Sequence, residues 1–308
     1  MLPLVTKLFS AEAIYPPFYV SSGTIVDMAV YDVFPFFNEL DVLEIRLNTL
    51  NSVVDYFLIT EATTTFSGNN KKLFLTENIA IFDKFRDKLI IQVVDDVPEL
   101  GPFERDWYQR DQAKLILKEL VKDSDLILYG DVDEIPKPES VIMASDLLSE
   151  TIKIAHFAQN LNYYYLNLKE CSGTLLSFAG EYENTAEKKW LGTTLCKWSY
   201  AKQFTMTELR NPEHKKVGCR VDDGGWHYSY VGGESGKSTE ERSRIKVISA
   251  AHQELNNRKI LSKIGKRTSK HKDLFGRKGS NFEIIKDLNY LPIYVQKNLD
   301  KFDYLLAK

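Results

Sequence analysis

The feature that most constrains the fold is an alternation of short apolar runs with amphipathic runs, from Ile25 to about Ser149. The apolar runs, rich in β-branched and aromatic residues, predict buried strands at residues 25–31, 56–60, 89–94 and 126–129. Leucines at helical spacing predict a helix over residues 40–50 with Asn38 as its cap, and Pro102 opens a second predicted helix. Strands that alternate with helices are typical of an α/β fold around a mostly parallel sheet.

The second half of the chain has a different pattern. Beyond Thr151 aromatic and polar residues are mixed, which indicates a mixed, antiparallel-rich half that completes a site and does not fold separately. Residues 238–255 regain helical order, because Ser238 and Glu241 have the spacing of a capping box.

Acidic residues follow three of the predicted strands. Glu61 ends the second strand, Asp96 follows the third, and Asp131 and Asp133 follow the fourth within GDVDEIP. In open α/β sheets, ligands bind at the carboxyl ends of the strands. We therefore expect these carboxylates to border a ligand site.

Asp131 and Asp133 lie two residues apart, so on an extended chain their side chains leave on the same face. Carboxylates in this arrangement suit Mg²⁺ or Mn²⁺ that also holds diphosphate oxygens. Residues i and i+2 of a strand are about 6.6 Å apart, so both ligate one ion only if the chain turns there. Otherwise we expect Asp133 on the metal and Asp131 on a ribose hydroxyl or a metal-bound water. The alternative interpretation is that the pair caps the turn after the strand.

Composition narrows the class of protein. The 308 residues contain 40 Lys and Arg against 43 Asp and Glu, a net charge of −3 that disfavours nucleic acid as a partner. Three cysteines (Cys171, Cys196 and Cys219) form neither a disulfide framework nor a metal motif, which fits a reducing compartment. No run of about 20 apolar residues and no signal peptide is evident, so we expect no membrane span and a cytoplasmic location.

Several blocks resemble a known family. Residues 25–68, VVDDVP, W-Y-Q-R, GDVDEIP-K-P and GGWHYSYVGG look like glycosyltransferase family 17 and occur in that family's order. The resemblance implies a GT-A-like single domain that is inverting and metal-dependent, with Mn²⁺ or Mg²⁺ and a UDP-sugar donor. By the same resemblance, the sugar is N-acetylglucosamine from UDP-GlcNAc, and it is moved in β linkage onto the hydroxyl of a glycan acceptor.

The resemblance also assigns an organisation and residues. It implies an N-terminal extension at 1–24 and a transferase domain at 25–308, whose nucleotide-sugar half is 25–150 and whose acceptor half is 151–308. Asp131 and Asp133 match the metal and nucleotide-sugar motif of the family. Trp226 and His227 match its Gly-Trp-His block, with Trp226 expected at the donor and His227 as a third contact to the cation or diphosphate.

Other site residues follow from position and charge. Arg110 needs an anionic partner, which is either a core carboxylate such as Glu61 or Asp96 or the donor diphosphate. Glu61 and Asp96 themselves either bind ribose or the uracil edge or cap loops. The general base is expected to be a carboxylate near the acceptor; the candidates are Asp222 and Asp223, with Glu181 and Glu134 as alternatives.

Two other functions compete with the transferase. A phosphatase of the haloacid dehalogenase type also places Asp-x-Asp after a strand, but it expects a small hydroxyl residue soon after, where this chain has Glu134-Ile135-Pro136. A non-catalytic carbohydrate-binding protein on a transferase fold is the other alternative. The intact Asp131, Asp133 and His227 argue against a degenerate site.

Overall fold

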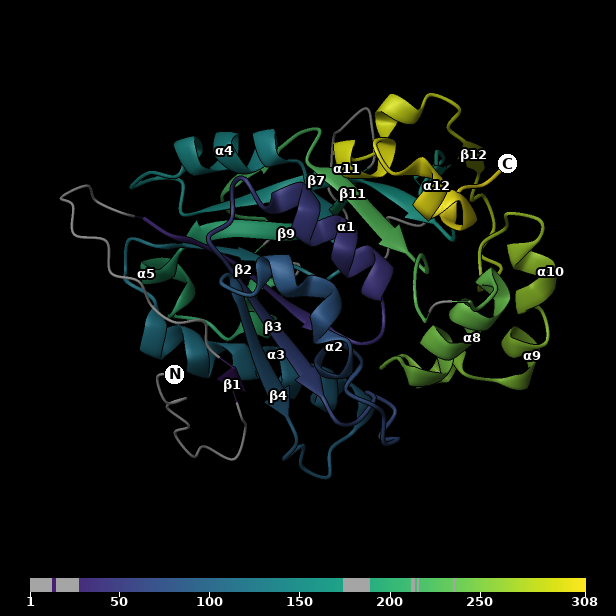
Figure 1. The fold of residues 1–308 in the computed structure, drawn as a ribbon, viewed down its shortest axis with the longest axis horizontal. Coiled ribbons are helices and arrows are strands. Elements are labelled where there is room, and N and C mark those ends of the chain that lie inside the picture. The colour runs from purple at the N-terminus through teal and green to yellow at the C-terminus, as the bar shows by residue number, and fades with distance from the viewer. Residues whose placement is uncertain (1–12, 15–27, 174–188, 212–213, 215, 235) are drawn as a thin grey trace.

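The computed structural model describes residues 13–14, 28–173, 189–211, 214, 216–234 and 236–308 (Figure 1). Twelve strands within these residues form one sheet, in the order β1-β4-β3-β2-β5-β9-β7-β11-β6, with β10, β8 and β12 attached to the side. The strands are β1 (Ala13–Ile14), β2 (Val30–Phe36), β3 (Tyr56–Ala62), β4 (Leu89–Val94), β5 (Leu126–Tyr129), β6 (Glu134–Pro136), β7 (Ile154–Tyr163), β8 (Leu168–Glu170), β9 (Trp190–Lys197), β10 (Cys219–Val221), β11 (Gly225–Ser229) and β12 (Phe282–Ile284).

Helices cover both faces of this sheet, and the predicted α/β class is confirmed. Figure 1 shows α8, α9 and α10 grouped at one side of the molecule. The helices are α1 (Leu40–Leu50), α2 (Phe74–Glu77), α3 (Pro102–Leu120), α4 (Pro138–Leu147), α5 (Trp198–Ala201), α6 (Met206–Leu209), α8 (Thr239–Ser249), α9 (Arg258–Leu261), α10 (Ile264–Thr268), α11 (Ile293–Gln296) and α12 (Leu299–Phe302).

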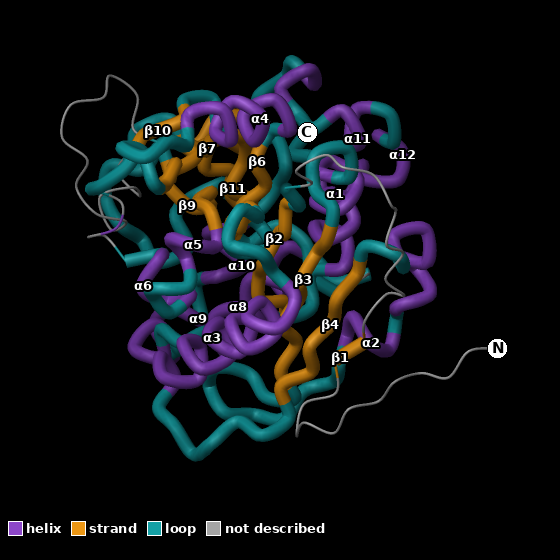
Figure 2. The backbone as a smooth tube through the Cα atoms, turned by 90° about the vertical axis from the view of Figure 1, so that its left-hand side faces the viewer, coloured by secondary structure: helices purple, strands orange, loops and turns teal. Residues whose placement is uncertain are grey.

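In the first half of the sheet β4, β3, β2 and β5 pair in parallel, and β1 pairs with β4 antiparallel at the edge. Figure 2 shows β2, β3 and β4 side by side. Side chains alternate between the two faces of each strand, so each face buries its own core. Phe34 and Phe57 pack with the leucines of α1 on one face, whereas Val33 and Leu58 pack with α3 on the other. The helix predicted over residues 40–50 and the one opened by Pro102 are both confirmed.

The second half contains both strand directions. β9 is antiparallel to β5 and β7, β11 is parallel to β7, and β6 is antiparallel to β11. Because β11 lies between β7 and β6, it places the residues around His227 beside the turn that follows β5. Two segments that are about 95 residues apart in the chain thereby meet at one edge of the sheet.

The predicted first strand is wrong in its bounds. Residues 25–27 lie outside the described residues, and β2 runs from Val30 to Phe36. Asp32, in the middle of this strand, is fully buried and forms an ion pair of 2.6 Å with Arg46 of α1. A carboxylate inside an apolar strand is costly unless it is paired, and its partner lies on another element. The sequence pattern therefore placed the end of the strand too early.

Two further predictions concern local structure. Ser238 and Glu241 form the predicted capping box at the start of α8, which is confirmed. Asn38 is not the cap of α1, because Glu39 occupies that position and makes no side-chain capping bond. In the described part of the chain, no helix has the length and apolar character needed to cross a bilayer.

Candidate active site

A pocket of about 350 Å³ opens at the carboxyl ends of β2, β3 and β5, where the strand-end argument places a site. Its lining includes four of the predicted site residues, Arg110, Asp131, Asp133 and His227. The remaining wall comes from the loops after β2 and β3 and from α8 and the residues that follow it. The size is that of a small-molecule site.

The turn after β5 presents the two aspartates to this pocket. The backbone N–H of Glu134 donates to the carbonyl of Asp131 at 2.9 Å, so the chain turns between the two aspartates and is not extended. Arg46 of α1 stabilises this turn, because its guanidinium donates to the carbonyls of Asp131 at 2.8 Å and Glu134 at 2.7 Å. The same group also donates to the carboxylate of Asp32. One buried guanidinium thus fixes the motif to β2 and α1.

Asp131 is held by two guanidinium groups. Its Oδ1 accepts a hydrogen bond from Arg110 at 2.6 Å, and its Oδ2 accepts one from Arg210 at 2.9 Å. Burial raises the pKa of Asp131, but Arg110 and Arg210 outweigh it, so the pKa lies below its usual value. Both carboxylate oxygens of Asp131 therefore already accept a hydrogen bond from a guanidinium group, while its side chain remains 28% exposed.

Arg110 finds its anionic partner in neither of the predicted carboxylates. It forms ion pairs with Asp106 at 2.7 Å, one helical turn earlier on α3, and with Asp131 at 2.6 Å. Arg110 is thus paired with carboxylates as one of the two predictions had it, but these are Asp106 and Asp131 and not the examples Glu61 and Asp96. Arg110 also lines the pocket, so a contact with a bound anion remains open to it.

Glu134, the third carboxylate of the turn, is fully buried. It accepts hydrogen bonds from Arg210 on both oxygens, from Trp190 Nε1 at 2.7 Å and from the N–H of Asp131 at 2.9 Å. Burial raises the pKa of Glu134, but Arg210 outweighs it and holds the pKa well below its usual value. A saturated, buried carboxylate cannot accept a proton from a substrate, so Glu134 is excluded as the general base.

Asp133 faces two groups of the second half of the chain. Its Oδ2 accepts a hydrogen bond from Lys246 Nζ at 2.7 Å, and its Oδ1 lies 3.7 Å from His227 Nε2. Lys246 Nζ also lies 3.4 Å from a carboxylate oxygen of Glu39. Burial lowers the pKa of Lys246, but the two carboxylates of Asp133 and Glu39 raise it by more. The net pKa lies above its usual value, so the side chain is an ammonium ion.

His227 is placed by the alternation of β11. Trp226 and Tyr228 stack with each other on one face, where Trp226 Nε1 donates to the carbonyl of Tyr290. His227 projects to the other face, into the pocket, and its ring lies 4.4 Å from that of Trp190. Trp226 is thus a buried core residue outside the pocket lining, contrary to its expected place at the donor.

Other predicted site residues also lie away from the pocket lining. Glu61 caps the start of α2, because its carboxylate accepts from the backbone of Leu75 and Thr76. Asp96 is exposed and accepts a hydrogen bond of 3.3 Å from Tyr108. Glu61 therefore follows the capping interpretation, whereas Asp96 contacts a side chain of α3 and, within the described residues, caps no loop.

The predicted bases are not brought to the pocket. The side chains of Asp222 and Asp223 are 80% and 71% exposed, and they pair with Arg220 and Lys137. They precede β11, but the turn before Gly225 directs them toward solvent. Glu181 lies outside the described residues.

Several residues of the site were not predicted from the sequence, among them Arg46, Glu39, Lys71, Trp190, Arg210 and Lys246. Arg46 carried a signal, since it shares the apolar stripe of its helix with Leu43 and Leu47. Nothing in the local sequence indicated Lys246 or Arg210. Each belongs to a polar segment, and only the tertiary structure brings that segment next to Asp131 and Asp133.

The donor set around Asp133 fits a divalent cation. Asp133 and His227 offer one carboxylate and one imidazole, whose Nε2 lies 3.7 Å from Oδ1 of Asp133, a separation at which one ion contacts both. Burial lowers the pKa of His227, which keeps the ring neutral as ligation requires. Within the described residues no three His, Cys, Asp or Glu side chains form a ready metal site. Two protein ligands suffice where substrate phosphates and water complete the coordination shell.

Comparison with known proteins identifies the family. The model of glycosyltransferase family 17 matches residues 23–308. The chain belongs to glycosyltransferase family 17. This membership confirms the resemblance seen in the sequence and favours the transferase over the phosphatase alternative.

Curated relatives of this family-17 chain carry one name. The human β-1,4-mannosyl-glycoprotein 4-β-N-acetylglucosaminyltransferase is 22% identical, with 87% of this chain and 53% of the relative covered. The rat protein of the same name is 23% identical, with the same coverage. The chain thus spans about half the length of these relatives. Among solved structures, the inositol-1-phosphate CTP transferase of T. maritima aligns with a TM-score of 0.35 and 13% identity, covering 71% of this chain and 96% of that one.

Proposed function

We propose that this family-17 chain is an inverting glycosyltransferase that moves N-acetylglucosamine from UDP-GlcNAc to a hydroxyl of a glycan acceptor in β linkage. The observation that carries the proposal is the pocket at the strand ends, where Asp131 and Asp133 meet three cationic side chains, Lys71, Arg110 and Lys246. Carboxylates and cations around one pocket suit a ligand that combines hydroxyl groups with a diphosphate. The names of the relatives support the choice of sugar.

A GT-A-like fold is part of this proposal. The parallel strands β2, β3 and β5 deliver their carboxyl ends to the nucleotide half of the pocket, and α8 and β11 supply the opposite wall. The donor nucleotide is assigned to the first wall and the reacting sugar to the side of His227 and Trp190. Asp131, fixed by two guanidinium groups, is oriented to accept a hydrogen bond from a ribose hydroxyl with its remaining lone pairs.

A divalent cation, Mn²⁺ or Mg²⁺, is assigned to Asp133 and His227. Its chemistry at that place is charge neutralisation on the departing diphosphate. Asp133 is 5% exposed and His227 8%, so both present their ligand atoms from a largely dehydrated wall. Electrostatic stabilisation is stronger in such a site than in water.

The proton of the acceptor hydroxyl needs a carboxylate within reach. Among the described residues that line the pocket, the carboxylates are Glu39, Asp131 and Asp133. Asp131 is neutralised by two guanidinium groups and Asp133 is assigned to the cation, which leaves Glu39 as the base. In the transfer, the acceptor oxygen bonds to the anomeric carbon, the bond from that carbon to the phosphate oxygen breaks, and UDP leaves with the electron pair. The hydroxyl proton passes to Glu39.

The test is transfer and slow hydrolysis of UDP-GlcNAc, measured by release of UDP with Mn²⁺ present. Asp133→Ala is expected to abolish turnover, and Glu39→Gln to lower kcat by at least a hundredfold with UDP affinity retained. The matched control is Asp223→Ala, which removes an exposed carboxylate outside the pocket and is expected to leave turnover unchanged. Full turnover by Asp133→Ala would show that the pocket is not the site of transfer.

A further inference from the structure

Three cationic side chains line the pocket, but they differ in how free they are to meet a ligand. The side chain of Lys71 is 6% exposed and that of Arg110 11%, and each is enclosed beside its own carboxylate. The side chain of Lys246 is 31% exposed and reaches the same cavity. Only Lys246, among these three, combines a partly exposed side chain with a flexible four-carbon stem.

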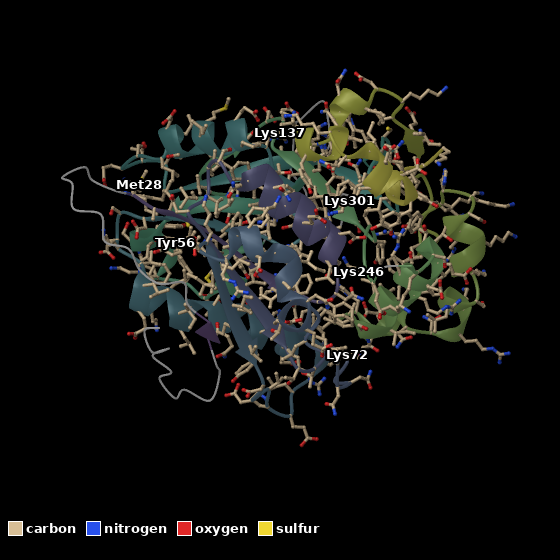
Figure 3. The ribbon with its side chains drawn as sticks, viewed as in Figure 1. Met28, Tyr56, Lys72, Lys137, Lys246 and Lys301 are labelled. Atoms are coloured by element: carbon tan, nitrogen blue, oxygen red, sulfur yellow. The ribbon has the colours of Figure 1, made fainter. Side chains whose placement is uncertain are left out.

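Helix α8 aims Lys246 at the site. The capping box at Ser238 fixes where the helix starts, and its buried face carries Arg242, Ser243 and Val247. Lys246 lies one turn after Arg242 and Ser243, so it belongs to the face that packs against the protein. Figure 3 shows it on the side of α8 that faces the centre of the molecule.

The ammonium group of Lys246 bridges two carboxylates from separate elements. Nζ lies 2.7 Å from Asp133, on the turn after β5, and 3.4 Å from Glu39, at the start of α1. It also lies 5.8 Å from the ring centroid of Tyr230. A single positive charge here partly neutralises two negative ones, and it bonds the oxygen of Asp133 that does not face His227.

We infer that Lys246 is a diphosphate-binding residue, which neutralises Asp133 and Glu39 in the free enzyme and moves to the diphosphate oxygens of the donor when the donor binds. The inference rests on the proposed function. It adds a binding role for Lys246 and a movement of its side chain when the donor binds. Lys246 then gives positive charge to the departing UDP, and its withdrawal leaves the carboxylate of Glu39 without its counter-charge. The lysine therefore acts as a binding residue for the leaving group.

The position of the groups supports this exchange. A cation held by Asp133 repels the ammonium ion, whose other neighbours are Glu39 and an aromatic ring. The diphosphate brings at least two negative charges into the same cavity. A flexible ammonium ion with three donors can follow these charges without any backbone movement, because the stem alone rotates.

The experiment measures binding and not turnover. Isothermal titration of UDP into the full chain, with EDTA and again with Mn²⁺, compares wild type with Lys246→Met, Lys246→Gln and Lys246→Arg. We expect the Met and Gln variants to bind UDP about ten- to a hundredfold more weakly, since a charged hydrogen bond is lost, and the Arg variant to retain most of the affinity. Mn²⁺ binding without UDP, followed by electron paramagnetic resonance, is expected to tighten in the Met and Gln variants, because Asp133 has lost a competing cation.

Lys237→Met is the matched control, because Lys237 precedes the same helix, pairs with Glu234 and lies outside the pocket lining. It is expected to bind UDP and Mn²⁺ as wild type does. Unchanged UDP binding in Lys246→Met and Lys246→Gln would overturn the inference and leave the proposed function intact. Failure of the wild-type chain to bind UDP would overturn both.

Discussion

Replacing Glu134 by Gln tests whether the buried carboxylate holds the site together. The substitution keeps the shape of the side chain and removes its charge, so Arg210 loses a partner that it contacts through two nitrogens. Breaking a buried ion pair by removal of one partner costs about 3–5 kcal/mol. Arg210 retains Asp131 at 2.9 Å, which places the expected loss near the lower end, at about 3 kcal/mol.

The assay is urea unfolding followed by far-UV circular dichroism at pH 7.5. For a chain of this size a loss of about 3 kcal/mol moves the unfolding midpoint down by about 1 M urea. Glu139→Gln, which alters an exposed carboxylate, is the control and is expected to leave the midpoint unchanged. A midpoint for Glu134→Gln within error of wild type would refute the reasoning.

The same pair of proteins gives a pH test. The pKa of Glu134 is lower in the folded chain than in the unfolded chain, so its contribution to stability is present above the unfolded pKa of about 4.3 and is lost as pH falls toward the folded pKa. Glutamine has no such proton to bind. The difference in unfolding free energy between wild type and Glu134→Gln is therefore expected to shrink below about pH 4, and a difference that widens there would contradict this assignment.

Three other substitutions test separate parts of the structure. Arg46→Met leaves its fully buried carboxylate partner unpaired and is expected to cost about 3–5 kcal/mol in urea unfolding; a loss under 1 kcal/mol would contradict the role of this guanidinium. Gly192→Ala places a methyl carbon 2.5 Å from the carboxylate carbon of Glu134, so we expect a destabilisation of about 1–3 kcal/mol and a lower melting temperature. The double substitution Asp222→Ala with Asp223→Ala is expected to retain the wild-type rate of UDP release, and a tenfold fall would return these residues to the list of bases.

Much of the nucleotide half was predictable because its signals are local. Helical spacing in residues 40–50, Pro102 at a helix start and the apolar runs of β4 and β5 each determine an element without help from distant parts of the chain. Because parallel strands end at one edge of the sheet, Asp131 and Asp133 were also predicted to border a ligand site, and both line the pocket.

The charges of the site were not predictable in the same way. Asp32 made a strand hard to recognise, because its counter-ion is on α1. Arg210, which bonds Asp131, and Lys246, which bonds Asp133, lie 79 and 113 positions later in the chain. A carboxylate at a strand end has the same local sequence whether it caps a turn, as Glu61 does, or faces a ligand, as Asp133 does. Only the tertiary structure separates the two cases.

The acidic residues of the turn after β5 differ in the cations that they contact. Asp131 and Glu134 are paired with guanidinium groups, whereas Asp133 is paired with Lys246, which we propose moves to a bound diphosphate. Rigid support with one exchangeable cation is an arrangement suited to binding and releasing a charged nucleotide.

The most direct measurement is a crystal structure of the chain grown with Mn²⁺ and UDP. The account predicts manganese on Asp133 and His227, the diphosphate beside it, and the ammonium group of Lys246 on a phosphate oxygen instead of on Glu39. Electron density for UDP and manganese away from the turn between Asp131 and Glu134 would contradict it.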